Sequence, residues 1–154
     1  MFGKTFLLIT FLIMSACGYE PIHSKKNLFD YNFSINELSF TGDRIVNLKI
    51  KQRLNNYTLN KKDKNFALKI FSSTDKVILG KNTSGDPTSF KSTVIVKVEF
   101  LGKNNIKNNL SLKESFNYNN NTNKFDLKRY EREVKNNLAE LITNQIVLKL
   151  TKFQ

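Results

Sequence analysis

The N-terminal stretch that leads to the one cysteine of the chain constrains this sequence more than any other feature. Lys4 gives a positive start, residues 6–14 form a mostly apolar run, and small residues precede Cys17. A basic start, a short apolar segment and small residues before a cleavage point are typical of a bacterial export signal. The apolar run is shorter than the ~20 residues that a membrane-spanning helix needs. We therefore expect residues 1–16 to be a signal peptide that is removed.

The cysteine directly follows these small residues, at the position where lipid attachment needs it. The arrangement resembles the lipobox of bacterial lipoproteins, whose cysteine receives lipid and becomes the new N-terminus. A plain secretory signal or an uncleaved anchor with an incidental cysteine is the alternative, and Met14, an unusual residue three places before Cys17, keeps it open. We expect lipidation at Cys17 and a solvated tether over residues 17–30, which Pro21 stiffens.

The charge balance indicates an anionic partner outside the cytoplasm. The chain has a formal net charge of +12, which favours nucleic acid, a membrane surface or phosphorylated lipid as the partner. Export argues against nucleic acid. Lysine and asparagine fill polar positions along the whole sequence, so we attribute about half of the positive excess to compositional drift. The apolar fraction of 40% predicts a folded chain, and residues 31–154 are long enough for a single domain held by packing alone.

Hydrophobic periodicity predicts strands and helices after the tether. The first strand changes phase at residues 36–37, which indicates a bulge or a strand end there, and Asp43 lies at the start of the helix that follows. Residues 77–79 either extend the second strand or form a separate edge strand. The predicted elements are strands over residues 31–40, 66–71, 90–100 and 110–118, and helices over residues 43 to about 61–64 and from 126 onward.

Two of these elements allow detailed predictions. The strand over residues 90–100 has strict period two, which places Val96 in the core at the centre of the sheet. In the second helix, Glu131 and Lys135 are spaced as an i,i+4 ion pair. The expected apolar stripe of that helix consists of Leu127, Tyr130, Val134, Leu138, Leu141, Ile142 and Leu148.

The order of the elements, β-α-β-β-β-α, predicts an α+β fold with two helices packed on one face of a mixed four-stranded sheet. The other face should then be polar and rich in lysine. A solvated polar face without a binding role is at least as plausible an interpretation as a lipid or partner surface, and the loops at residues 81–87 and 102–109 are the other candidates. The lysines expected to project together from this face are Lys69, Lys91, Lys97 and Lys113.

The sequence offers little to an enzyme. There is no glycine-rich phosphate loop, and after lipidation no free thiol would remain. The acidic residues Asp63, Asp75, Asp86 and Glu99 form no spaced pair that could share acid and base roles. The one histidine, His23, lies in the tether without a partner at metal-binding spacing. We therefore predict no catalytic residues, no metal site and no cofactor.

The segment Cys17–Ile22, with the sequence Cys-Gly-Tyr-Glu-Pro-Ile, resembles the Cys-Gly-aromatic-x-Pro-Leu start of the LPS-assembly lipoproteins (LptE/RlpB) of Gram-negative bacteria. The predicted layout of strand, helix, three strands and long C-terminal helix is also similar to that family. So are Asp43-Arg44 and Arg53-Leu54-Asn55-Asn56 in the first helix, and residues 138–146 in the second.

The resemblance implies a protein without enzymatic activity, anchored by lipid to the periplasmic face of the outer membrane. Members of the family sit as a plug inside the large β-barrel LptD, assist its assembly and help lipopolysaccharide reach the cell surface. The expected partners are therefore an LptD-like barrel, lipopolysaccharide and the membrane that holds the anchor, with no role for nucleic acid. The alternative is a free-standing periplasmic lipoprotein, a binding or structural module without a barrel partner.

Overall fold

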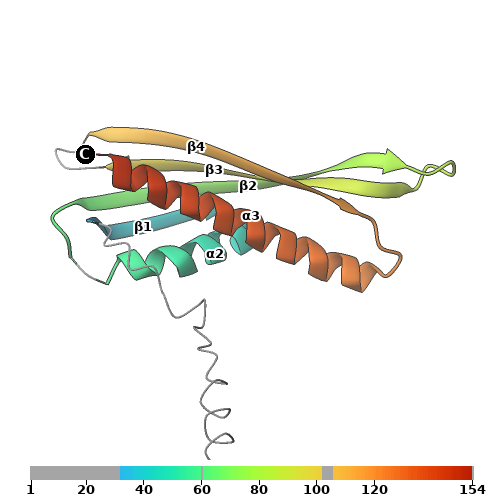
Figure 1. Ribbon diagram of the computed structural model, residues 1–154, viewed down its shortest axis with the longest axis horizontal. Helices are drawn as coiled ribbons and strands as arrows, with labels where there is room; N and C mark the ends of the chain where they lie inside the picture. The colour runs from blue at the N-terminus through green and yellow to red at the C-terminus, as the bar shows by residue number, and fades with distance from the viewer. Residues whose placement is uncertain (1–31, 60, 102–105, 154) are drawn as a thin grey trace, which may run out of the picture. The chain divides into compact units, whose positions relative to one another are not determined.

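The computed structural model describes residues 32–59, 61–101 and 106–153. Cys17 and the predicted signal peptide, tether and His23 lie outside these residues. Figure 1 shows one sheet with both long helices beneath it. The elements are β1 (Ser34–Gly42), α2 (Arg44–Leu54), the short 3-10 helix η1 (Asn55–Tyr57), β2 (Asn65–Lys81), β3 (Pro87–Leu101), β4 (Lys107–Asn119) and α3 (Lys124–Lys152).

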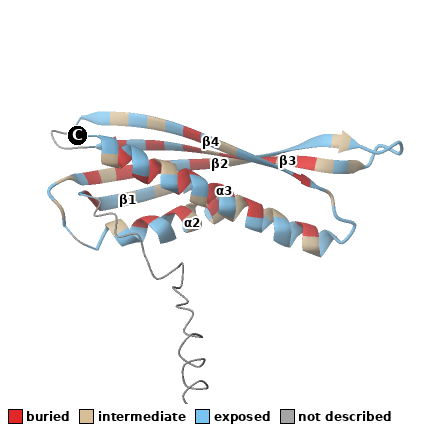
Figure 2. Ribbon diagram, viewed as in Figure 1, coloured by how far each residue is buried: buried red, intermediate tan, exposed pale blue. Residues whose placement is uncertain are grey.

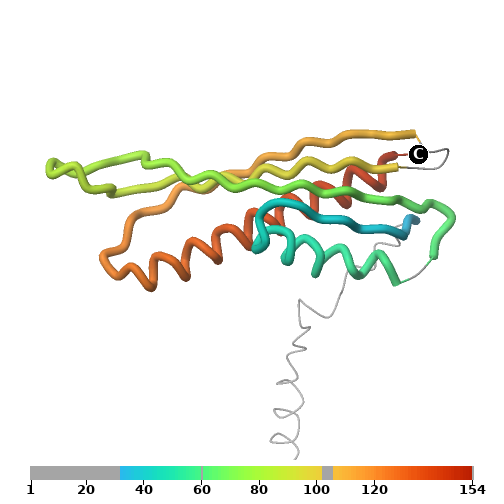
Figure 3. Tube along the Cα trace, turned by 180° about the vertical axis from the view of Figure 1, so that it is seen from behind, coloured from blue at the N-terminus to red at the C-terminus, as the bar shows by residue number. Residues whose placement is uncertain are grey.

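The sheet of the described domain has four strands in the order β1-β2-β3-β4. β1 runs parallel to β2, because α2 carries the chain back between them, whereas β2, β3 and β4 pair antiparallel through hairpins. Both α2 and α3 lie on the same side of the sheet, as the two opposite views of Figures 1 and 3 show. The predicted α+β fold class, element order and one-sided helix layer are therefore confirmed.

The core lies between the sheet and the two helices. On β3 the alternating residues Phe90, Val94, Val96, Val98 and Phe100 are all buried, as period two predicts, and Val96 has no exposed surface. Val46, Ile50 and Leu54 bury one face of α2, at helical spacing. Figure 2 shows the buried residues following the strands and the facing sides of the helices.

The predicted irregularity near residues 36–37 is a β-bulge. The register of β1 against β2 shifts between Ile35 and Glu37, so one residue of β1 has no counterpart in β2. Phe33 and Ile35 before the bulge are buried, and Leu38 and Phe40 after it pack against the core from the same side. The bulge therefore corrects the phase of the hydrophobic pattern.

The ends of some elements differ from the prediction. α2 ends at Leu54, not near residues 61–64, and one turn of 3-10 helix follows. Tyr57 still packs on the core, stacked on Phe33 with a centroid distance of 5.3 Å, so its apolar spacing did not require a continuous helix. Residues 77–79 belong to the 17-residue strand β2, so the extension is the correct alternative.

The apolar stripe of α3 was only partly predicted. Tyr130, Leu141 and Leu148 are exposed. The helix packs against α2 as well as the sheet, so its buried side includes the smaller residues Ala139 and Thr143 in place of these three. The predicted pair of Glu131 with Lys135 is also wrong, since both side chains contact other elements, as described below. The residues of α3 that are buried are Leu127, Val134, Leu138, Ala139, Ile142, Thr143, Ile146, Val147 and Leu150.

Candidate functional site

The sheet face that the helices leave uncovered carries the four predicted lysines. Strand alternation decides this placement, because side chains of neighbouring residues point to opposite faces. Lys69 lies between the buried Leu68 and Ile70, and Lys97 lies between the buried Val96 and Val98. Lys91 follows the buried Phe90, and Lys113 follows the buried Leu112. All four therefore project from the outer face, although their predicted role in binding stays a prediction.

The strand register brings three of these lysines together and separates the fourth. Lys97 pairs with Phe71 and Ser111, so Lys69 on β2 and Lys113 on β4 are its diagonal neighbours, roughly 7–8 Å away by ordinary sheet geometry. Lys91 lies four residues beyond the row of Lys113, about 13 Å along the strands. We name Lys69, Lys97 and Lys113 the lysine diagonal.

Carboxylates interrupt the positive charge of this face. Glu99 is the direct cross-strand partner of Lys69, and its Oε2 lies 2.9 Å from Nζ of Lys107 on β4. Glu37 projects from the bulge in β1, in the row that contains Ala67. Strand alternation alone predicts the lysines of this face, whereas their acidic neighbours follow only from the cross-strand register.

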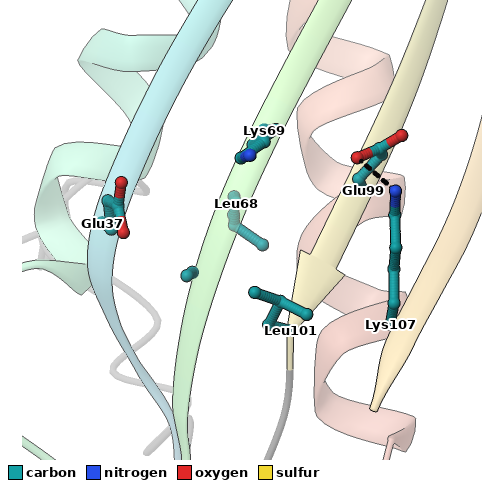
Figure 4. A pocket seen from close by; sticks show the side chains of 7 residues that line it. Glu37, Leu68, Lys69, Glu99, Leu101 and Lys107 are labelled. Carbon is teal, nitrogen blue, oxygen red and sulfur yellow. Dashed lines mark ion pairs between the residues drawn. The ribbon is translucent and has the colours of Figure 1, made fainter. Parts of the chain in front are cut away.

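A hollow of about 120 Å³ opens at the end of this face (Figure 4). Ala67 and Leu101 give it an apolar lining, with the buried Leu68 behind them, and Lys69 and the ion pair of Glu99 with Lys107 supply its charged lining. Glu37 faces them from β1, because the bulge turns the strand at this point. The phase slip in the sequence predicted the bulge but gave no sign of the hollow.

A second, shallower depression of about 310 Å³ adjoins the first. Phe71 contributes an exposed ring, and Lys97 extends the cationic side, while Lys69 and Glu99 line both depressions. The two hollows and the lysine diagonal therefore form one continuous surface, which we name the outer-face site. An apolar lining beside charged groups suits an amphiphile that has a short apolar group beside an anionic head.

The ion pair of Glu99 with Lys107 can open for such a ligand. The side chains of Glu99 and Lys107 are 47% and 57% exposed. An exposed pair of this kind contributes only about 0–1 kcal/mol, since water screens both charges. A phosphate could thus replace Glu99 as the partner of Lys107 at little cost to the fold.

On the opposite face, Asp43 fixes α2 to β2 and α3. Its carboxylate caps the helix by accepting from the backbone N–H groups of Ile45 and Val46, and it also accepts from Thr74 Oγ1 and Lys135 Nζ at 2.9 and 3.1 Å. Burial raises the pKa of Asp43, but the hydrogen bonds and the charge of Lys135 outweigh burial, so the pKa lies below its ordinary value. This network explains why Lys135 does not pair with Glu131.

Glu131 instead connects α3 with the far ends of β2 and β4. It pairs with Lys76 and accepts a hydrogen bond of 3.1 Å from the hydroxyl of Tyr118. Lys76 also lies 3.8 Å from the centre of the Phe90 ring, a cation–π contact. Burial, together with the bond to Glu131, raises the pKa of Tyr118, so its hydroxyl stays protonated as the donor. Both helix-side networks are structural.

Residues 32–59, 61–101 and 106–153 contain no group of three histidine, cysteine or acidic side chains that could hold a metal ion. Within the same ranges, neither helix has the length and apolar character that a bilayer span requires.

Comparison with known proteins gives a structural likeness without a sequence match. No family model matches the sequence, and no curated protein matches it. The fold is similar to the crystal structure of the rare lipoprotein B from Shewanella oneidensis, with a TM-score of 0.53 and 13% identity over 74% of this chain and 96% of that one. It is also similar to the solution structure of an uncharacterized lipoprotein B from Nitrosomonas europaea, with a TM-score of 0.53 and 14% identity over 79% and 84% of the two chains. At this identity the likeness establishes a shared fold.

Proposed function

We propose that this chain is an outer-membrane lipoprotein that serves as the plug and assembly partner of an LptD-like β-barrel and helps lipopolysaccharide reach the cell surface. The observation that carries the proposal is the agreement of two independent features. The segment from Cys17 to Ile22 resembles the start of the LptE/RlpB family, and the described domain has the fold of a protein named rare lipoprotein B. Neither the N-terminal segment nor the fold depends on the other.

The outer-face site supports a role in contact with phosphorylated lipid. Lysines 69, 97 and 113 offer three ammonium groups at diagonal spacing, and a charge-assisted hydrogen bond to phosphate is about twice as strong as a neutral one. The apolar hollow beside them can take part of an acyl chain, because Leu101 and Ala67 form its apolar lining. In this role the protein carries out no reaction; it positions charge and apolar surface for a substrate that the barrel conducts.

The polar sheet face also supports docking inside a barrel. Large outer-membrane barrels have polar, water-filled interiors, so a plug needs a charged and polar surface to lie against them. The outer face meets this requirement with serine and threonine at Ser39, Thr41 and Ser111 around the lysines. An obligate interface of this type commonly buries more than ~2,000 Å² in total.

The test is a pull-down of the native lipoprotein from its own envelope in mild detergent, followed by identification of the proteins recovered. We expect a large outer-membrane barrel at a fixed ratio to the lipoprotein. Depletion of the lipoprotein should lower the level of correctly assembled barrel and weaken the envelope barrier. Recovery of no barrel, or a folded barrel with lipopolysaccharide at the surface after depletion, would replace this proposal with the free-standing lipoprotein.

A further inference from the structure

The edge of β2 becomes free halfway along the strand. The pairing of β1 with β2 ends at Gly42 opposite Ser72, where Gly42 adopts a φ of +101° and turns the chain into α2. A side chain at Gly42 would place its Cβ 1.8 Å from the carbonyl oxygen of Ser72. Only glycine therefore allows the chain to leave β1 this close to the backbone of β2. Beyond Ser72, no strand of the described domain pairs with β2 on this side.

The free edge presents backbone groups in a regular pattern. The carbonyl of Ser72 points toward this edge, because it accepts a 3.1 Å hydrogen bond from the N–H of Asp43. In a strand the backbone groups of alternate residues point to the same edge. The N–H and C=O groups of Thr74, Lys76 and Ile78 therefore point away from β3, until the register shift after Ile78 ends the regular stretch.

This edge is also apolar at its far end. Val77, Ile78 and Leu79 are 43%, 48% and 50% exposed, and they lie in the part of the β2–β3 hairpin that projects beyond β1 and α2 in Figure 1. An exposed edge with apolar residues is a template for pairing with another strand. Residues 73–78, which we name the open edge, are long enough for the strand addition seen in peptide recognition.

The charges of the open edge disfavour a second copy of this chain as the added strand. In an antiparallel pair of two copies, directly opposed residues project from the same face of both, so Asp75 cannot lie opposite Lys76 of the other copy. Two antiparallel registers pair most of residues 73–78 with the same residues of the other copy. One places Asp75 opposite Asp75, and the other places Lys76 opposite Lys76. Like charges in direct opposition destabilise a strand pair. Antiparallel pairing with a segment of different sequence is therefore favoured over pairing with a second copy.

We propose that the open edge accepts an extended segment of the barrel partner, which joins the sheet as an additional strand. This inference rests on the proposed function and names the surface by which the barrel is held. The barrel wall itself is closed and has no free edge, so the donor must be a loop or terminal segment that enters the lumen. Complementarity requires a cation opposite Asp75 and apolar side chains opposite Val77 and Ile78.

The test compares Lys76→Pro with Lys76→Ala in the full-length lipoprotein, purified with the barrel from the envelope. Both variants lose the contact of Lys76 with Glu131, but only proline removes the N–H that points to the added strand. Proline is tolerated at an edge position whose N–H does not serve the internal ladder. We expect Lys76→Pro to recover about tenfold less barrel than Lys76→Ala, with equal melting temperatures of the two variants.

A photocrosslinking residue at position 77 gives a second readout that does not depend on the folding of the proline variant. Asn117 is the matched control, because it shares a row of the outer face with Val77 but lies on β4. We expect position 77 to crosslink to a loop or terminal segment of the barrel, and position 117 to give no crosslink to that segment.

The outcomes separate the two proposals. Equal barrel recovery by both Lys76 variants would overturn the inference while the barrel partnership stands. Loss of the barrel from the wild-type pull-down would overturn the proposed function and the inference with it. Crosslinking of position 77 to a second copy of this chain, or to the barrel wall alone, would show that the open edge has another occupant.

Discussion

Replacing Val96 with aspartate tests the face assignment on which both the core and the outer-face site depend. Val96 has no exposed surface and pairs with Ser72 and Leu112 at the centre of the sheet. Loss of the buried side chain costs about 1.5 kcal/mol. A carboxyl that must stay protonated at pH 7 has its pKa raised by about 3 units, which costs a further ~4 kcal/mol. The total is comparable with the ~5–15 kcal/mol of stability of a typical domain.

Urea unfolding followed by circular dichroism measures this loss, with Lys97→Asp as the control on the opposite face of the same strand. We expect Val96→Asp to be unfolded or barely folded at pH 7, and Lys97→Asp to stay within about 0.5 kcal/mol of wild type. The introduced carboxyl has a raised pKa when folded, so the penalty should shrink as pH falls toward 4. A Val96→Asp protein that melts like wild type at pH 7 would refute the assignment of faces.

Three further predictions follow from other parts of the chain. Intact-mass analysis of the native protein should show residues 1–16 removed and Cys17 acylated; an unmodified thiol or a retained leader would contradict the predicted anchor. Gln at all three positions of the lysine diagonal should weaken lipopolysaccharide binding at low salt, whereas Lys91→Gln should leave it near wild type, because Lys91 lies apart. Unchanged binding in the triple variant would move the lipid role to a loop such as residues 81–87. The lowered pKa of Asp43 stabilises the fold above its ordinary value of 3.8, and this stability is lost as pH falls through the folded pKa. Asp43→Asn should therefore reduce the acid dependence of urea unfolding, and a variant with the wild-type pH profile would show that the network carries no stability.

Local patterns in the sequence predicted those elements whose buried face has one uninterrupted period. Apolar residues alternate along β3, so its buried apolar residues could be named in advance, although Ser92 and Thr93 are buried as well. The slip at residues 36–37 predicted the bulge in β1. The packing of both helices on one face of a mixed sheet also followed, because each element has a single apolar face to bury.

The predictions that were wrong concern residues of α3 whose contacts are made with several other elements. Leu141 fits a helical stripe on its own, yet α3 faces both the sheet and α2, and this turns Leu141 to solvent. Glu131 and Lys135 have the spacing of a helical pair, but such a pair contributes only a few tenths of a kcal/mol. The part-buried partners Asp43 and Tyr118 offer stronger contacts, so tertiary structure decided these side chains.

The open edge could not have been predicted, because it depends on where one strand stops beside another. β1 pairs with only the first half of the long strand β2, and the departure of the chain at Gly42 exposes the rest. The same one-sided arrangement leaves the outer face uncovered, so the sheet has a free face and a free half-edge that meet along β2. On the helix side, Asp43 forms an ion pair with Lys135, and Glu131 forms one with Lys76. On the outer face, the acidic neighbour of the lysine diagonal is Glu99, which is exposed to solvent and lies opposite Lys69. Lys69 of the diagonal and the open edge thus belong to the same strand, whereas Lys97 and Lys113 lie on β3 and β4. A barrel segment bound at the open edge would have Lys91, the cross-strand partner of Val77, as its nearest outer-face lysine, and the lysine diagonal would lie further along the sheet.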